Sequence, residues 1–151
     1  MEIENIKDII DYGVIGLLIL MSVLTFTFAI ERLIFFSSID LKLYRHKLEL
    51  ELDLTKRLGA IATIGSNAPY IGLLGTVLAI IITFYIIGDK QDDINTGEIM
   101  KHLALALKAT AAGLVVAIPA TVIYNALLTK VDRIISRWEI MQDEKETRNY
   151  R

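Results

Sequence analysis

Threonine side chains recur at helical spacing in two long apolar segments of this 151-residue sequence. Thr76 and Thr83 are seven residues apart in one segment, and Thr110 and Thr121 are eleven apart in the other, so each pair falls on one helical face. A hydroxyl group in apolar surroundings can offer a hydrogen bond to a charged carboxylate and so ease its deprotonation. Thr76 and Thr110 are the candidates for a proton path, and Thr83 and Thr121 are candidates for a pore or helix-packing face.

Small residues accompany these threonines on the same faces and allow two interpretations. They are Gly72 and Ala79 beside Thr76 and Thr83, and Ala106, Gly113 and Ala117 beside Thr110 and Thr121. Small faces let helices approach closely in lipid, and hydroxyls in membrane helices often bond to their own backbone. The pattern predicts either a helix-packing face within one subunit or a polar conduit.

Acidic groups are missing from the centres of both segments. The ionisable side chain present, Lys108, lies near one end of the second segment, about 200° around the helix from Thr110. Proton relays in membranes use ionisable side chains, so a carboxylate would have to come from a partner. The sequence has no cysteine, no metal-ligand spacing, no phosphate loop and no Ser/His/Asp arrangement. We therefore predict no enzyme, no metal and no cofactor.

Three apolar stretches are long enough to cross a bilayer, which takes about 20 residues of helix. With 54% hydrophobic residues overall, we predict an all-α membrane protein with transmembrane helices at 12–36, 68–87 and 98–128. The first span is rich in Leu, Ile, Phe and Val and is expected to be a permanent anchor that faces lipid, because an acidic start is unlike a signal peptide. The net charge of −2 suggests no nucleic-acid partner.

Positive charges predict the orientation of these spans. Twelve Lys and Arg residues lie in 32–67 and after residue 128, against three at Lys7, Lys90 and Lys101. Inner flanks carry the excess, so the N-terminus is expected outside and the C-terminus inside. The other segments are then an outer amphipathic segment at 1–11, an inner helical linker at 37–67, an outer loop at 88–97 and an inner helical tail at 129–151.

Some local features of these segments allow alternatives. The stretch 48–54 alternates like a strand, yet its residues also fit a helix, which we prefer because a lone strand leaves its edges unpaired. A frayed terminus is the alternative for 1–11. Asn67 and Pro69 fit the first turn of the second span.

The third span is expected to continue as one helix from about 98 to 146. Its tail carries an apolar stripe that includes Val131, Ile134 and Trp138. A stripe of this kind calls for a partner helix, and self-association is the simplest expectation.

Two motifs resemble the signatures of the MotA/TolQ/ExbB proton-channel family. They are Asn67-Ala-Pro-Tyr-Ile-Gly-Leu-Leu-Gly-Thr-Val77 and the run Lys108-Ala-Thr-Ala-Ala-Gly-Leu-Val-Val-Ala-Ile-Pro-Ala-Thr-Val-Ile-Tyr-Asn125. Their order, spacing and predicted topology also match. The ExbB branch is the most similar and the TolQ branch is next.

The resemblance implies a homo-oligomer, expected to be a pentamer, in the inner membrane of a Gram-negative bacterium, with the N-terminus in the periplasm. The second and third spans would line a pore that holds an ExbD-type single-span partner carrying a membrane aspartate, and the assembly would drive a TonB-type protein. Thr76 and Thr110 match the family's pore threonines. Gly72, Ala79, Ala106 and Gly113 match pore or packing positions.

Two departures from the family pattern accompany the resemblance. The family usually has a glutamate five residues before its third-span threonine, where this sequence has Leu105, with Lys108 in the same turn. The linker is also short. Two alternatives to an ExbB-type function stay open, namely a TolQ-type subunit of the Tol-Pal envelope system and a non-conducting membrane scaffold.

Overall fold

The computed structural model describes residues 2–89 and 96–149, and every element in this part of the chain is a helix. In order these are α1 (Glu2–Ser38), the 3-10 helix η1 (Leu41–Leu43), α2 (Lys47–Thr55), α3 (Leu58–Asp89) and α4 (Thr96–Asn149). Three of them, α1, α3 and α4, are long and apolar enough to cross a membrane. The predicted class, an all-α protein with three long apolar helices, is confirmed. Most of the predicted loop at 88–97 lies outside the described residues.

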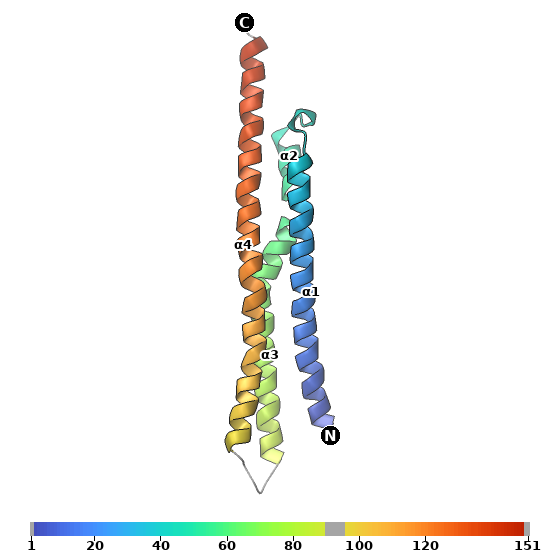
Figure 1. Ribbon diagram of the computed structural model, residues 1–151, viewed down its shortest axis with the longest axis vertical. Coiled ribbons are helices and arrows are strands. Elements are labelled where there is room, and N and C mark those ends of the chain that lie inside the picture. Colours follow the sequence, from blue (N-terminus) through green and yellow to red (C-terminus); the bar gives the residue numbers. More distant parts are fainter. Residues whose placement is uncertain (1, 90–95, 150–151) are drawn as a thin grey trace.

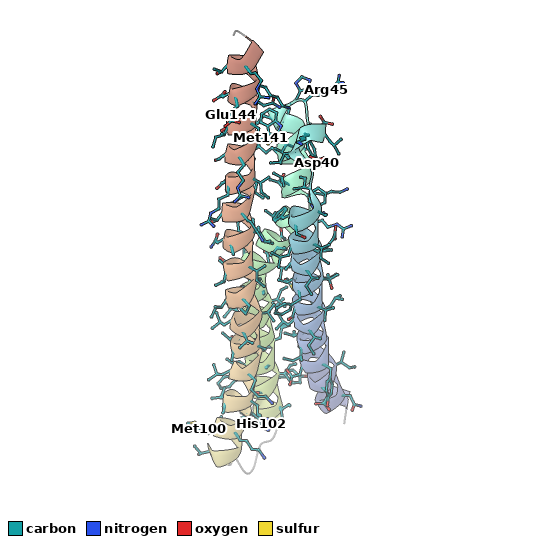
Figure 2. The ribbon with its side chains drawn as sticks, turned by 45° about the horizontal axis from the view of Figure 1, so that its top comes forward. Asp40, Arg45, Met100, His102, Met141 and Glu144 are labelled. Atoms are coloured by element: carbon teal, nitrogen blue, oxygen red, sulfur yellow. The ribbon has the colours of Figure 1, made fainter. Side chains whose placement is uncertain are left out.

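The three long helices run side by side as an elongated bundle (Figure 1). The start of α1 lies at the same end as the end of α3 and the start of α4, while α2 and the end of α4 lie towards the other end. Figure 2 shows Met100 and His102 at the first end, and Asp40, Arg45, Met141 and Glu144 at the second. The described part of the predicted segment 1–11 is the beginning of α1, although the side chains of Ile3 and Ile6 are outside the described residues.

The sequence suggested that α1 is an anchor that faces lipid, but α1 also packs into the bundle. It contacts both α3 and α4 and buries Leu18, Thr25, Ala29 and Arg32. The Thr25 hydroxyl donates to the carbonyl oxygen of Met21 at 3.0 Å, which satisfies it within its own helix. The opposite face of α1 is exposed and apolar, so one side faces outward and the other joins the bundle.

α2 docks against the second half of α4. Leu50 and Leu54 are fully buried, in one cluster with Val131, Ile134 and Trp138 of α4. The indole Nε1 of Trp138 donates to the carbonyl oxygen of Tyr44 at 3.1 Å. The alternating leucines of 48–54 are therefore helical here, and Leu50 and Leu54, which are four residues apart, face α4.

This docking corrects the argument for self-association. The apolar stripe on the tail of α4 is covered by α2 and the end of α1 within the same chain. A short helix from the linker reaches the stripe because η1 and its flanking residues reverse the chain after α1. The stripe therefore gives no reason of its own to expect a second copy.

α3 begins ten residues earlier than the predicted second span. Its first turns bury Leu58 and Ile61 in the α2–α4 cluster, which extends the helix towards the linker. Asn67 and Pro69 are consequently inside the helix, and the Asn67 amide donates to the carbonyl oxygen of Thr63 at 2.8 Å. The expectation that Asn67 and Pro69 form a first turn was wrong, because tertiary packing outweighed the local signal.

α4 is one helix of 54 residues. At 1.5 Å per residue it is about 80 Å long, more than twice the thickness of a hydrocarbon core. Pro119 lies inside it without ending it. The same helix therefore supplies both the membrane-length contact with α3 and the docking surface for α2.

Candidate functional site

The predicted threonine and small-residue faces of α3 and α4 face each other. Gly72 and Gly113 lie at the crossing point, where a Cβ on Gly72 would be 2.6 Å from the carbonyl oxygen of Ala109. A Cβ on Gly113 would be 2.6 Å from the carbonyl oxygen of Ala68. Only glycine fits at such distances, so these two residues bring the backbones of the helices together.

Thr76 and Thr110 meet one turn from this crossing. Their hydroxyl oxygens are 2.6 Å apart, and either of them can be the donor. Thr76 also lies 3.1 Å from the carbonyl oxygen of Ala106 and 3.3 Å from that of Gly72. Thr76 is 6% exposed, whereas Thr110 is half-buried. In the single chain, Thr110 is thus the member of the pair that a further group can reach.

The side chains of the remaining predicted residues lie along the same faces but do not join this pair. Ala79, Ala106 and Ala117 are buried. Thr83 is buried and donates to the carbonyl oxygen of Ala79 at 2.8 Å, and Thr121 donates to that of Ala117 at 2.9 Å. Backbone bonding within each helix therefore occupies these two hydroxyls, whereas among the described residues the hydroxyls of Thr76 and Thr110 bond to each other across the two helices.

Lys108 is two residues from Thr110 in the sequence, but it does not join the hydroxyl pair. Lys108 is exposed and lines a cavity with Asp8 and Asp11 of α1, on a different side of α4. Among residues 2–89 and 96–149, no group of three or more His, Cys, Asp or Glu side chains could hold a metal ion. The site can donate and accept hydrogen bonds, and it holds no acid or base of its own.

An ionic network at the far end of α1 was only partly visible in the sequence. Arg32 is 4% exposed, donates to the backbone oxygen of Asp53 at 2.9 Å and pairs with Glu31 at 2.9 Å. Glu31 also pairs with Arg57, whose positive φ of 67° marks the link between α2 and α3. The adjacency of Glu31 and Arg32 was a signal, but nothing local indicated Arg57.

The contact between α1 and α3 was also only partly visible in the sequence. A Cβ on Gly75 would be 2.9 Å from a methyl group of Val14 and 3.0 Å from the Cβ of Ala109. Gly75 therefore admits α1 to the α3–α4 crossing. Its place in the small-residue run was the one signal that could have shown this.

The sequence is similar to a protein family and to several known proteins. The profile of the MotA/TolQ/ExbB proton channel family matches residues 30–140. "Biopolymer transport protein ExbB" of Aquifex aeolicus is 53% identical over 93% of this chain and 95% of its own length. "Putative biopolymer transport protein ExbB-like 2" of Helicobacter pylori is 51% identical over 95% of both chains. "Tol-Pal system protein TolQ" of Pseudomonas aeruginosa is 37% identical over 62% of this chain and 40% of its own.

Proposed function

The chain belongs to the MotA/TolQ/ExbB proton channel family, and from this premise we propose that it is a stator subunit that couples the proton motive force to TonB-dependent import. The match to proteins named ExbB over nearly the whole chain supports this role. The shorter match to TolQ makes the Tol-Pal role the second candidate. The Thr76–Thr110 hydroxyl pair is the observation that carries the mechanism.

The proposed assembly is a homo-oligomer, expected to be a pentamer, in the bacterial inner membrane. An ExbD-type single-span helix would bring the membrane aspartate that α3 and α4 lack, and a TonB-type protein would receive the resulting motion. The distribution of Lys and Arg supports a periplasmic N-terminus and a cytoplasmic C-terminus. In that orientation α2 and the end of α4 extend into the cytoplasm.

A carboxyl group in a low-dielectric pore prefers to be neutral, because burial raises its pKa. The hydroxyl pair can serve the group in both of its states. When the carboxyl is protonated it donates to Thr110, Thr110 donates to Thr76, and Thr76 donates to the carbonyl oxygen of Ala106. The 2.6 Å and 3.1 Å contacts allow this relay.

When the carboxyl loses its proton, the direction of the relay reverses. Thr76 then donates to Thr110, and Thr110 donates to the carboxylate, which stabilises the charge. The two states differ only in which hydroxyl hydrogen points where, so the helices need not move. The partner helix moves instead, since its neutral and charged carboxyl groups favour different positions. Each charge crossing 100 mV supplies about 2.3 kcal/mol for that motion.

Substitutions of the two threonines test this mechanism. Thr76→Val and Thr110→Val keep the side-chain shape and remove the hydroxyl, so both are expected to reduce proton flux in liposomes that contain the chain and its co-encoded single-span partner. Thr76→Ser and Thr110→Ser retain the hydroxyl and are the matched controls. Normal flux in both valine variants would show that the hydroxyl pair has no part in conduction.

Two further measurements separate the alternatives. A non-conducting scaffold predicts no flux above that of empty liposomes, with or without the partner. A TolQ-type subunit predicts that deletion weakens envelope constriction and leaves growth on imported iron chelates unchanged. An ExbB-type subunit predicts the reverse.

A further inference from the structure

A groove between α1 and α4 is not used by the proposed proton path. It consists of three adjoining cavities of about 240, 300 and 200 Å³. The first two share Ile15, and the last two share Ser22, Val115 and Val116, so they form one continuous depression along the two helices. The hydroxyl pair lies at the α3–α4 contact and is therefore separate from it.

The groove is charged at one end and apolar along the rest. Asp8, Asp11 and Lys108 line the first cavity. The described ion pairs, which join Arg32 and Arg57 to Glu31 and Lys47 to Glu139, include none of these three groups. The apolar part is lined mainly by side chains of both helices, which are Leu18, Ile19, Val23, Val115, Val116 and Pro119. The carboxylates of Asp8 and Asp11 and the ammonium of Lys108 thus line an open volume and do not form one of the described ion pairs.

The length of the groove matches one leaflet of a bilayer. Lys108 and Pro119 are eleven residues apart, which is about 16 Å along a helix. Half of a hydrocarbon core is about 15 Å. With the charged end at the membrane surface, the apolar end therefore reaches the bilayer midplane, which is the depth of an acyl chain.

From this match we propose that the groove binds one phospholipid with an ammonium-bearing headgroup, in the leaflet that contains the start of α1. The headgroup ammonium hydrogen-bonds to Asp8 and Asp11, its phosphate pairs with Lys108, and one acyl chain lies along Val115 and Val116. Charge complementarity selects the lipid: a headgroup with both signs of charge satisfies all three side chains, and a primary ammonium supplies the N–H donors that a quaternary one lacks.

The test measures lipid retained by the full chain, purified in mild detergent, by mass spectrometry after incubation with phosphatidylethanolamine, phosphatidylcholine or phosphatidylglycerol. Phosphatidylethanolamine is expected to be retained about tenfold better than phosphatidylglycerol, the effect of one charge-assisted hydrogen bond. The double variant Asp8→Asn/Asp11→Asn keeps Lys108 and is expected to lose or invert this preference. Lys101→Gln is the control, because it changes an exposed charge on α4 that does not line the groove, and it should leave the lipid preference unchanged.

A second variant tests the apolar part. Val115→Phe adds bulk at a residue that lines the groove and is expected to lower retention of all three lipids. Leu114→Phe, at the adjacent position that does not line the groove, is expected to change none. The proposal is wrong if the aspartate double variant keeps the wild-type preference, or if the wild-type chain retains the three lipids equally.

A photoreactive side chain at Ser22 distinguishes a lipid from another copy of the chain as the occupant. Adducts with the mass of a lipid are the expected product, obtained from membranes before purification. A crosslinked dimer in their place would show that a neighbouring subunit covers the groove and would overturn the proposal.

Discussion

Gly72 of α3 and Gly113 of α4 touch through their backbones: a Cβ placed on either one would lie 3.1 Å from the Cα of the other. This contact sets the separation of the two helices at the point where Thr76 and Thr110 meet. The hydroxyl pair therefore depends on two residues that have no functional group.

Gly72→Ala is expected to destabilise the protein by about 1–3 kcal/mol, because its Cβ would push against a backbone oxygen and force the helices apart. Gly59 lies in the same helix with open space around its Cβ position. Gly59→Ala is expected to be neutral or stabilising by up to about 1 kcal/mol, since alanine favours helix. Thermal unfolding in detergent measures both, and equal effects would contradict the close crossing.

Glu31→Gln is expected to destabilise the end of α1 by about 1–3 kcal/mol, because Arg32 would stay buried without its carboxylate. The double variant Glu31→Gln/Arg32→Met removes the charge that the single change leaves unpaired, and it should recover much of the loss. Unfolding midpoints of the two variants check this. A double variant less stable than the single one would show that Arg32 acts mainly through its bond to the backbone of Asp53.

Leu50→Ala is expected to loosen α2 from α4 at a cost of about 2–5 kcal/mol, because it empties a fully buried position. Trp138 is the one tryptophan in the sequence and contacts this region, so its emission should shift to longer wavelength when α2 undocks. Leu48→Ala removes the same atoms from a side chain that is 66% exposed and should leave the emission unchanged. A shift of equal size in both variants would place α2 elsewhere.

Docking of α2 is expected to be insensitive to pH from about 6 to 9 and to weaken in alkali. The pKa of Lys47 is raised by the hydrogen bond and ion pair that Lys47 makes with Glu139. The pKa of Tyr44 is raised by burial and then by the hydrogen bond of Tyr44 to Asp53. A raised pKa means that the folded state holds the proton more tightly than the unfolded state. Both contributions are therefore present below the unfolded values of about 10 and are lost as pH rises through the folded ones.

Trp138 emission followed from pH 7 to 12 tests this. Lys47→Met removes one of the two titrating groups and should reduce the alkaline change. An acid-induced change in its place, with none in alkali, would contradict the assignment.

Features that depend on local periodicity could be predicted from the sequence. The faces that carry Thr76 and Thr110 follow from residue spacing alone, and so do the length and continuity of α4. The family was also predicted, since its two motifs are continuous in the chain, and the comparisons confirmed it. Spacing could not say that the two hydroxyls meet at 2.6 Å, because this depends on how two helices cross.

Features that depend on contacts distant in sequence were missed for the same reason. The start of α3 at Leu58 is decided by burial against α2 and α4, which outweighs the capping signal of Asn67 and Pro69. The cover on the α4 stripe comes from a helix about eighty positions earlier in the chain, and the Arg57–Glu31 pair joins α1 to the link before α3. Each of these needs the fold before it can be seen.

The unbroken course of α4 fixes an angular relationship between its two ends. Thr110 and Trp138 are 28 residues apart on a single helix, so one residue inserted between them would turn the two faces by about 100° relative to each other. A seven-residue insertion would nearly restore that phase while adding about 10 Å of length. The number of residues between the α3–α4 contact at Thr110 and the α2 docking surface at Trp138 is therefore constrained. This constraint applies even at positions whose side chains are exposed.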